Sequence, residues 1–301
     1  MSDALRVRSG RRTVEVNRPD KVLFPELGLT KADLVEYYRS VARWMVPQLK
    51  GRPLMLECHP DGVGGPRFMR KNAPDSYPDW IRRAEVTKKG GTVAHPVCDN
   101  EATLLYLAGQ ACLTFHRWQS RADRPDAPDR LVFDLDPAGD DFEAVRKAAF
   151  QLGDLLGELK LPSMLMTTGS KGLHVVVPLD RRAGFDDVRD FAAEVAATLA
   201  ARDPDRLTTE VRTEAREGRL YLDIQRNGYA QTAVAPFSVR ARQEAPVATP
   251  ISWDQLKDPA VTARRWTVTN VLEQARTDPW ADVPARGRAL GPARERLARL
   301  R

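Results

Sequence analysis

Apolar residues recur with a helical period in several stretches, and each of these stretches predicts an amphipathic helix. One stretch covers about 31–48, where Thr30 precedes it as a good N-cap. Asp140 or Asp141 caps another, and further helices are expected over about 100–112 and 186–201. The apolar stripe of the first helix is formed by Leu34, Tyr37, Val41 and Met45, and that of the Asp-capped helix by Phe142, Val145, Ala149, Leu152 and Leu156.

Strand-like stretches stand between these helices. They are expected at 53–58, at 84–98 as a hairpin about Gly90-Gly91, at 164–178 as strand, loop and strand, and over about 219–242. Residues 252–301 read as mostly helical and broken by prolines. The sum predicts an α+β fold in which antiparallel hairpins are mixed with helices, rather than a regular βαβ alternation.

Length and composition describe a globular protein. The chain has 301 residues, of which 42% are hydrophobic and 29% charged. No apolar run approaches the roughly 20 residues of a membrane span, and the N-terminus lacks the apolar segment of a secretory signal. Cys58, Cys98 and Cys112 are far apart, show no zinc spacing and fit a reduced cytosol, so plain packing and a cytoplasmic location are expected.

The charge balance is basic, which is a weak indication of a polyanionic partner. Lys and Arg number 47 against 41 Asp and Glu, a net charge of +6. The tail from Arg286 to Arg301 holds six arginines and one acid, so it is either a solvated terminal helix or a contact for nucleic acid.

The stretch LVFDLDP, 131–137, carries two acids on one apolar strand. Asp134 and Asp136 are two residues apart, so both point to the same face. Like charges on a strand repel, and burying them costs free energy unless they are paired or bound to metal. This pattern alone favours a polar edge strand. Asp223 in LYLDIQ interrupts a second apolar strand, and if the two strands are neighbours the three aspartates predict a metal site.

The loop TTGSKGLH, 167–174, offers anion chemistry. Gly169 and Gly172 permit a tight turn with free backbone N–H groups, and Ser170, Lys171 and His174 add donors. A hairpin turn with a solvated lysine is the plainer interpretation, and the loop is not a Walker A motif.

Three motifs in this order, D-L-D at 134–136, TGSKGLH at 168–174 and YLDIQ at 221–225, resemble the archaeo-eukaryotic primase superfamily. The chain is similar to the polymerase domain of the bacterial multifunctional DNA ligase D, used in non-homologous end joining. The similarity extends over essentially the whole chain, through DKVLFPELGLTK (20–31), YYRSVARWMVPQLKGRPL (37–54), PDGVGG (60–65), PDWI (78–81), RLVFDLDP (130–137), TAVAPFSVRAR (232–242) and DPW (278–280).

The resemblance implies a primase-polymerase fold, with mixed sheets that form a catalytic cleft flanked by helices. It implies addition of NTP or dNTP, often ribonucleotides, to a 3′ end with Mn²⁺ or Mg²⁺. Carried over by position, Asp134, Asp136 and Asp223 hold the metals, and Asp223 helps to position the primer hydroxyl. The nucleotide residues are then Thr168, Ser170, Lys171, His174, His116, Gln225 and Arg240, and the DNA 5′-phosphate end meets Lys21, Lys31 and Phe68.

We expect residues 1–301 to form a single domain. Within it, 1–115 would contact the DNA end, 116–250 would be the catalytic core, and 251–301 would be a helical, basic tail. The resemblance implies DNA with gapped or broken ends as partner, with a Ku-like protein and a separate ligase as further partners, for a monomer that works near the nucleoid. No K-x-D-G adenylation motif occurs, and a standalone polymerase is favoured over an excised domain.

The chain departs from the family pattern at a few positions near Phe68. Met69 follows Phe68 where the family has two aromatics, and Glu57-Cys58 replaces basic residues. These changes leave the metal site alone and bear on the grip on the 5′-phosphate and DNA end.

Three rival functions are compatible with parts of the sequence. A haloacid-dehalogenase-type phosphatase also uses D-x-D at a strand end, but there a Rossmann-like sheet follows, whereas here Pro137 replaces the usual small residue and hairpins follow. A non-catalytic DNA-end-binding protein is disfavoured because the acids, the glycine loop and Arg240 are all present. A primase that starts without a primer stays open, as do sugar preference, template dependence and the choice between end joining and excision repair.

Overall fold

The computed structural model describes residues 4–88, 90–284 and 287–300. The chain divides into two compact units that are each built from separate segments. The first unit is formed by Met1–Trp118, Val234–Ala248 and Trp266–Arg276. The second is formed by Gln119–Ala233, Thr249–Arg265 and Thr277–Arg301. The units therefore do not coincide with the three subregions expected along the chain, which stay a prediction about function.

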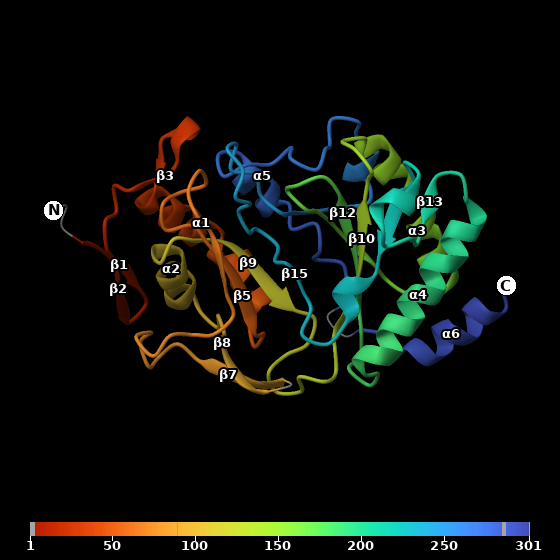
Figure 1. Cartoon of the computed structure of the whole chain (residues 1–301), viewed down its shortest axis with the longest axis horizontal. Coiled ribbons are helices and arrows are strands. Elements are labelled where there is room, and N and C mark those ends of the chain that lie inside the picture. The colour runs from red at the N-terminus through yellow and green to blue at the C-terminus, as the bar shows by residue number, and fades with distance from the viewer. Residues whose placement is uncertain (1–3, 89, 285–286, 301) are drawn as a thin grey trace. The chain divides into compact units, whose positions relative to one another are not determined.

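The first unit combines small antiparallel sheets with three helices (Figure 1). Its largest sheet has the strand order β15-β9-β5-β6, and β7 and β8 form the hairpin expected around Gly90-Gly91. The elements are β1 (Leu5–Ser9), β2 (Arg12–Val16), β3 (Val22–Phe24), η1 (Pro25–Leu27), β4 (Leu29–Thr30), α1 (Lys31–Leu49), β5 (Leu54–Cys58), β6 (Phe68–Arg70), β7 (Arg83–Lys88), β8 (Gly91–Pro96), α2 (Glu101–Gly109), β9 (Cys112–Trp118) and α5 (Val271–Arg276), while β15 (Thr232–Val234) spans the boundary.

Helix α1 confirms the periodicity argument. Thr30 and Asp33 form a complete capping box at its start. Its predicted stripe, Leu34, Tyr37, Val41 and Met45, is buried.

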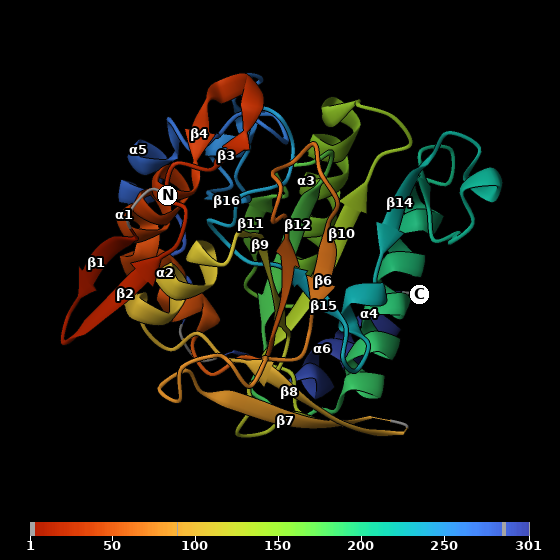
Figure 2. The same ribbon diagram turned by 60° about the vertical axis from the view of Figure 1, so that its left-hand side comes forward.

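The second unit is built on a six-stranded sheet in the order β13-β14-β10-β12-β11-β16 (Figure 2). All neighbours are antiparallel except β13 and β14. The elements are β10 (Arg130–Asp136), α3 (Phe142–Glu158), β11 (Met164–Thr167), β12 (Leu173–Pro178), α4 (Phe185–Arg202), β13 (Leu207–Thr208), η2 (Thr213–Arg216), β14 (Leu220–Asp223), η3 (Gln225–Asn227), β16 (Thr249–Ile251), η4 (Gln255–Lys257) and α6 (Leu290–Ala298). The α+β class is confirmed.

The two faces of strand β10 have different roles. Leu131, Phe133 and Leu135 are fully buried, and helices α3 and α4 contact this strand and each other. In Figure 1 both helices lie on the same side of β10 and β12. Because side chains alternate along a strand, Asp134 and Asp136 point to the opposite face. The core thus fixes the strand from one side and leaves its carboxylates on the other.

A buried arginine on helix α3 fixes the chain after β16. The Arg146 guanidinium donates to the carbonyl oxygens of Leu256, of Asp258 at 2.9 Å and of Val261 at 2.8 Å. Buried carbonyl groups that lose a charged donor are left without a partner, which costs free energy. This side chain therefore determines the path of residues 256–261.

We expect Arg146→Met to lower the free energy of unfolding by about 3 kcal/mol, because it orphans these carbonyls. Lys147→Met is the matched control, since Lys147 is exposed and its ammonium lies 3.9 Å from Glu143. It should change stability by less than about 0.5 kcal/mol. Urea unfolding of both variants measures the difference, and equal midpoints would contradict the role of Arg146.

Two predicted element ends need correction. The helix expected over 100–112 ends at Gly109, because Ala111 has a φ of 55° and Cys112 already begins β9. The strand expected up to residue 242 ends at Val234, because Pro236 precedes Phe237, whose φ is 64°. Arg240 and Arg242 therefore do not lie on a regular strand.

The segment 251–301 is less helical than expected. Within the described residues it holds α5, α6 and the short η4, separated by loops. Prolines interrupt it, and the loops cover the sheet of the second unit instead. Trp280 donates from Nε1 to the Leu165 carbonyl at 2.8 Å and packs with Val283 against Val132, Met164 and Val176. Arg286 and Arg301 lie outside the described residues.

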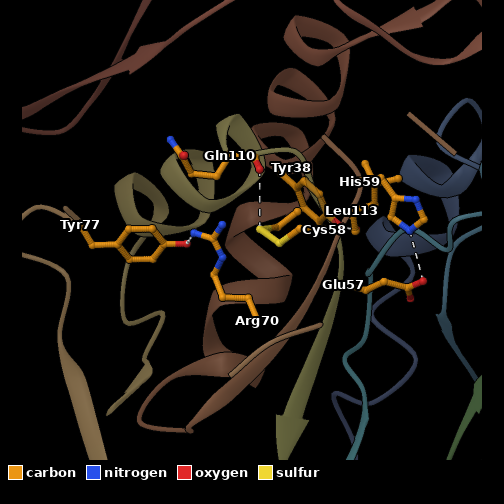
Figure 3. Close-up of a disulfide and its surroundings, with 9 residues drawn as sticks. Tyr38, Glu57, Cys58, His59, Arg70, Tyr77, Gln110 and Leu113 are labelled. Atoms are coloured by element: carbon orange, nitrogen blue, oxygen red, sulfur yellow. Dashed lines mark hydrogen bonds and ion pairs between the residues drawn. A yellow bond between two sulfur atoms is a disulfide. The ribbon is translucent and has the colours of Figure 1, made fainter. Parts of the chain in front are cut away.

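Two of the three cysteines are bonded, contrary to the expectation of plain packing. Cys58 and Cys112 form a disulfide between β5 and β9 (Figure 3). The two residues are partners in the strand register, although 54 positions separate them in sequence, so the pairing became visible only with the fold. Cys98 is a buried free thiol, and burial raises its pKa. No helix in the described ranges is long and apolar enough to cross a membrane.

Candidate active site

Strands β10 and β14 bring the three aspartates together. The strands pair antiparallel, and Asp134 stands directly opposite Asp223 in the register. Side chains at directly opposite positions are about 5 Å apart at Cβ, and Asp136 follows on the same face of β10. The hypothesis that the two strands are neighbours is confirmed.

Cationic and polar groups surround these carboxylates. Asp134 Oδ2 lies 3.3 Å from Arg226 Nε and 3.4 Å from His174 Nε2. Asp136 Oδ2 lies 3.2 Å from Arg216 Nη1. Asp223 Oδ1 accepts from the backbone N–H of Gln225 at 2.7 Å. Positive charge therefore offsets the repulsion between Asp134 and Asp136 in the free protein.

The two aspartates of β10 differ in pKa. Burial on its own raises the pKa of Asp134, but the charges and hydrogen bonds of His174 and Arg226 outweigh it and lower that pKa to about 2. Burial and then the Asp134 charge raise the pKa of Asp136, with Arg216 opposing them. Asp134 is thus held ionised more firmly than Asp136.

The donor set suits a hard divalent cation, because carboxylate oxygens are the ligands that Mg²⁺ and Mn²⁺ prefer. Such a cation would also offset the Asp134 charge, which after burial is the second cause of the raised pKa of Asp136. In the described part of the chain, however, no group of three or more His, Cys, Asp or Glu side chains is arranged to hold a metal ion. Arg216 and Arg226 instead pair with one carboxylate oxygen each, Oδ2 of Asp136 and Oδ2 of Asp134.

The glycine loop joins β11 and β12 beside the aspartates. His174 is the register partner of Asp134, which places the end of the loop next to the carboxylates. Gly169 has a φ of 64°. A Cβ on Gly172 would lie 2.1 Å from the Leu135 carbonyl oxygen, so only glycine permits this approach of the loop to β10.

Several of the predicted nucleotide residues already have structural partners. The buried Thr168 hydroxyl donates to the Gly172 carbonyl at 3.0 Å and accepts from the Gly172 N–H at 3.3 Å, so it closes the loop. Gln225 Oε1 accepts from Arg189 at 3.0 Å. Lys171 Nζ lies 3.5 Å from Asp140, outside the loop.

The remaining predicted site residues belong to the first unit. His116 lies on β9 opposite Met55, and the Arg240 backbone N–H donates to Pro246. Phe68 and Met69 stand on β6 with 41% and 42% of their surface exposed. The structure thus groups Asp134, Asp136, Asp223, Thr168, Ser170, Lys171, His174 and Gln225 in the second unit, and His116, Arg240, Lys21, Lys31 and Phe68 in the first.

Lys21 and Lys31 lie close together, as their pairing in the family implies. The Lys31 backbone N–H donates to the Lys21 carbonyl at 2.9 Å. Lys21 Nζ meets Asp61 Oδ1 at 2.5 Å, and Lys31 Nζ donates to the Asn17 carbonyl at 2.9 Å. Burial, and then the positive charges of Arg18 and Lys21, lower the pKa of Lys31. Such a cluster of cations favours an anionic ligand.

Glu57, the acid that replaces a basic residue, is buried in an ion pair of its own. Its Oε1 lies 3.2 Å from His59 Nε2, and accepts from Arg67 Nη1 at 2.7 Å; Figure 3 shows the His59 contact beside the disulfide. The hydrogen bond from His59, followed by that from Arg67, outweighs the effect of burial and lowers the pKa of Glu57 to about 2.

A depressed carboxyl pKa stabilises the fold above the ordinary value near 4.5, and that stabilisation is lost as the pH falls toward 2. We expect Glu57→Gln to lose at most about 3 kcal/mol of unfolding free energy at pH 7, and progressively less between pH 5 and about 2. Glu85→Gln, at an exposed position of β7, should show no such trend. Urea unfolding at several pH values checks this, and a Glu57→Gln difference that stays constant with pH would contradict it.

Two arginines that pair with the aspartates were not predicted from the sequence. Arg216 and Asp136 are 80 positions apart, and Arg226 and Asp134 are 92. Arg226 lies just after β14 and Arg216 at the end of η2, before it. No spacing rule singles them out, although both flank the strand that carries Asp223.

The comparisons with known proteins agree with the motifs. The family model for the LigD primase-polymerase domain matches residues 30–280. The multifunctional non-homologous end joining protein LigD of Mycolicibacterium smegmatis is 34% identical over 291 residues, which are 96% of this chain and 38% of that protein. Its counterpart in Pseudomonas aeruginosa is 30% identical over 295 residues, 96% of this chain and 35% of that protein. The chain thus spans under two fifths of the length of these two relatives.

A solved structure shows the same fold. It is the polymerase domain from Mycobacterium tuberculosis Ligase D in complex with DNA, with a TM-score of 0.83 and 33% sequence identity. The match covers 92% of this chain and all of that one (100%). The resemblance drawn from three motifs is confirmed. The chain belongs to the family of LigD primase-polymerase domains, and it is a nucleotidyltransferase.

Proposed function

We propose that this enzyme adds nucleotides to the 3′ end of a DNA strand at gaps or double-strand breaks during repair. The observation that carries the proposal is the register pairing of Asp134 with Asp223, next to Asp136 and to a glycine loop that ends at His174. Family relatives named for non-homologous end joining, and a neighbour solved with DNA, support it.

In the proposed reaction the primer 3′-hydroxyl gives up its proton to water and its oxygen forms a bond to the α-phosphorus. The bond from that phosphorus to the bridging oxygen breaks as pyrophosphate leaves. Asp134, Asp136 and Asp223 hold divalent cations, Mn²⁺ or Mg²⁺, and Asp223 orients the primer hydroxyl. When bound, such cations offset the charge that spreads over the transferred phosphoryl group. Ser170, Lys171 and His174 hold the triphosphate, and His116 and Arg240 of the first unit contact the nucleotide.

The first unit supplies the grip on the downstream DNA end in this proposal. Lys21 and Lys31 bind the 5′-phosphate by charge, without reading sequence, and the exposed Phe68 stacks near that end. The lowered pKa of Lys31 supports the site, because an added anion relieves the repulsion among its cations. The same proposal includes a preference for ribonucleotides. It also includes a Ku-like protein and a separate ligase as partners, and a location in the bacterial cytoplasm.

A primer with a short gap tests both parts. With Mn²⁺ and either rNTPs or dNTPs, we expect extension that is stronger when the downstream strand carries a 5′-phosphate. Lys21→Ala should remove that advantage, about tenfold in apparent affinity, because it deletes one charge-assisted contact.

Lys50→Ala makes the same change of charge at the C-terminal end of helix α1, whose N-terminal end carries Lys31, and should leave the advantage intact. No extension of any primer by the wild-type protein would overturn the proposed activity. Extension that is the same with and without the 5′-phosphate, and in wild type and Lys21→Ala, would overturn the end-binding role alone.

A further inference from the structure

A pocket of about 330 Å³ lies beside the glycine loop in the second unit. Its lining includes Ser170 and Lys171 of the loop, and Arg264 from the segment before Trp266. Asp140 and Phe142, at the start of helix α3, also line it, as do Thr262 and Ala263. The pocket thus joins the loop to a segment distant in sequence that no motif singled out.

One carboxylate stands between two cations in this pocket. Asp140 Oδ1 lies 3.5 Å from Lys171 Nζ and 3.6 Å from Arg264 Nη2. Asp140 has 72% of its side chain exposed, against 43% for Lys171 and 37% for Arg264. Ion pairs this exposed contribute little free energy, so a ligand with several negative charges can displace the single carboxylate.

Arg264 is held in place against the loop. Its Nε donates to the Ser170 carbonyl at 2.8 Å, and its Nη2 lies on the side of Asp140. The preceding residues 256–261 are fixed by the buried Arg146 described above. A guanidinium fixed in this way loses little freedom when it binds a phosphate, which favours affinity.

We propose that this pocket binds the terminal phosphates of the incoming nucleoside triphosphate, with Arg264 as a further phosphate-binding residue and Asp140 as the carboxylate that those phosphates displace. The inference rests on the proposed function, because it extends the same nucleotide site. Lys171 and Arg264 both line the pocket, so two cationic side chains are available to an extended polyphosphate. The pair also stabilises the pyrophosphate as it leaves.

The test compares Arg264→Ala, Arg264→Lys and Asp140→Asn. In primer extension we expect Arg264→Ala to raise KM for the nucleotide about tenfold or more with a smaller change in kcat, and Arg264→Lys to recover part of the loss. Asp140→Asn should lower KM a few-fold, because it removes the competing charge. A merely structural arginine would not produce this opposite effect at Asp140.

Arg265→Ala is the matched control, since it removes the same charge from an exposed neighbour that does not line the pocket. Equal KM values for Arg264→Ala and Arg265→Ala would overturn the inference, while extension itself would keep the proposed function. Calorimetric titration with inorganic tripolyphosphate decides the inference even if no variant extends a primer. Binding should weaken in Arg264→Ala and tighten in Asp140→Asn. If Arg264→Ala does not fold, unchanged or weaker binding by Asp140→Asn is enough to overturn it.

Discussion

Asp134→Asn and Asp223→Asn are each expected to reduce primer extension by at least about 10³-fold. The carboxylates stand opposite each other on β10 and β14, and in the proposed mechanism they hold the cations that offset transition-state charge. Loss of that stabilisation is worth several kcal/mol, which corresponds to about three orders of magnitude in rate. Because the two aspartates act together, the double variant should be little worse than either single one.

Folding and catalysis must be measured separately for these variants. Asp134→Asn also leaves Arg226 and His174 without their carboxylate, so its unfolding midpoint in urea should fall as well. Mn²⁺ binding followed by calorimetry should weaken in both variants. Asp154→Asn, at an exposed position of α3, is the control and should leave extension and Mn²⁺ binding unchanged. Extension above a tenth of the wild-type rate in both site variants would refute the metal role of these residues.

Local patterns predicted much of the second unit. The apolar stripe and Asp cap of α3, the hairpin around the glycine loop and the acids on two apolar strands were all visible in the sequence, because each depends on residues a few positions apart. The same reasoning allowed the pairing of Asp134 and Asp223 only as a hypothesis, because strand order is decided by long-range packing.

Contacts that join distant segments escaped the sequence. The disulfide of Cys58 with Cys112 follows from the pairing of β5 with β9, and Arg264 reaches the loop from 94 positions away. The division into units interleaves segments such as Val234–Ala248, which no change in composition marks. The arginines at the site, such as Arg264, are thus placed by the topology of the fold and are not marked by any motif.

Gly172→Ala is expected to impair both folding and nucleotide binding, because the loop and β10 meet at this residue. A Cβ there would lie 2.1 Å from the Leu135 carbonyl oxygen, between the positions of Asp134 and Asp136 in the chain. Either the loop or the strand end has to move, and both carry proposed site residues. Overpacking of this kind costs about 1–3 kcal/mol of stability, and displacement of Ser170 and Lys171 should raise KM for the nucleotide about tenfold or more.

Two other glycines separate these effects. Gly139 lies in the neighbouring loop with nothing within 4 Å of an added Cβ, so Gly139→Ala should preserve both stability and KM. An added Cβ on Gly287 would lie 2.2 Å from the Leu179 backbone nitrogen, beyond the far end of β12 from the glycine loop. Gly287→Ala should therefore lose stability as Gly172→Ala does and yet keep its KM. If both clashing variants lose stability and both show a proportional rise in KM, the effect of Gly172→Ala is general destabilisation. A rise in KM confined to Gly172→Ala instead ties the close approach of loop and strand to nucleotide binding.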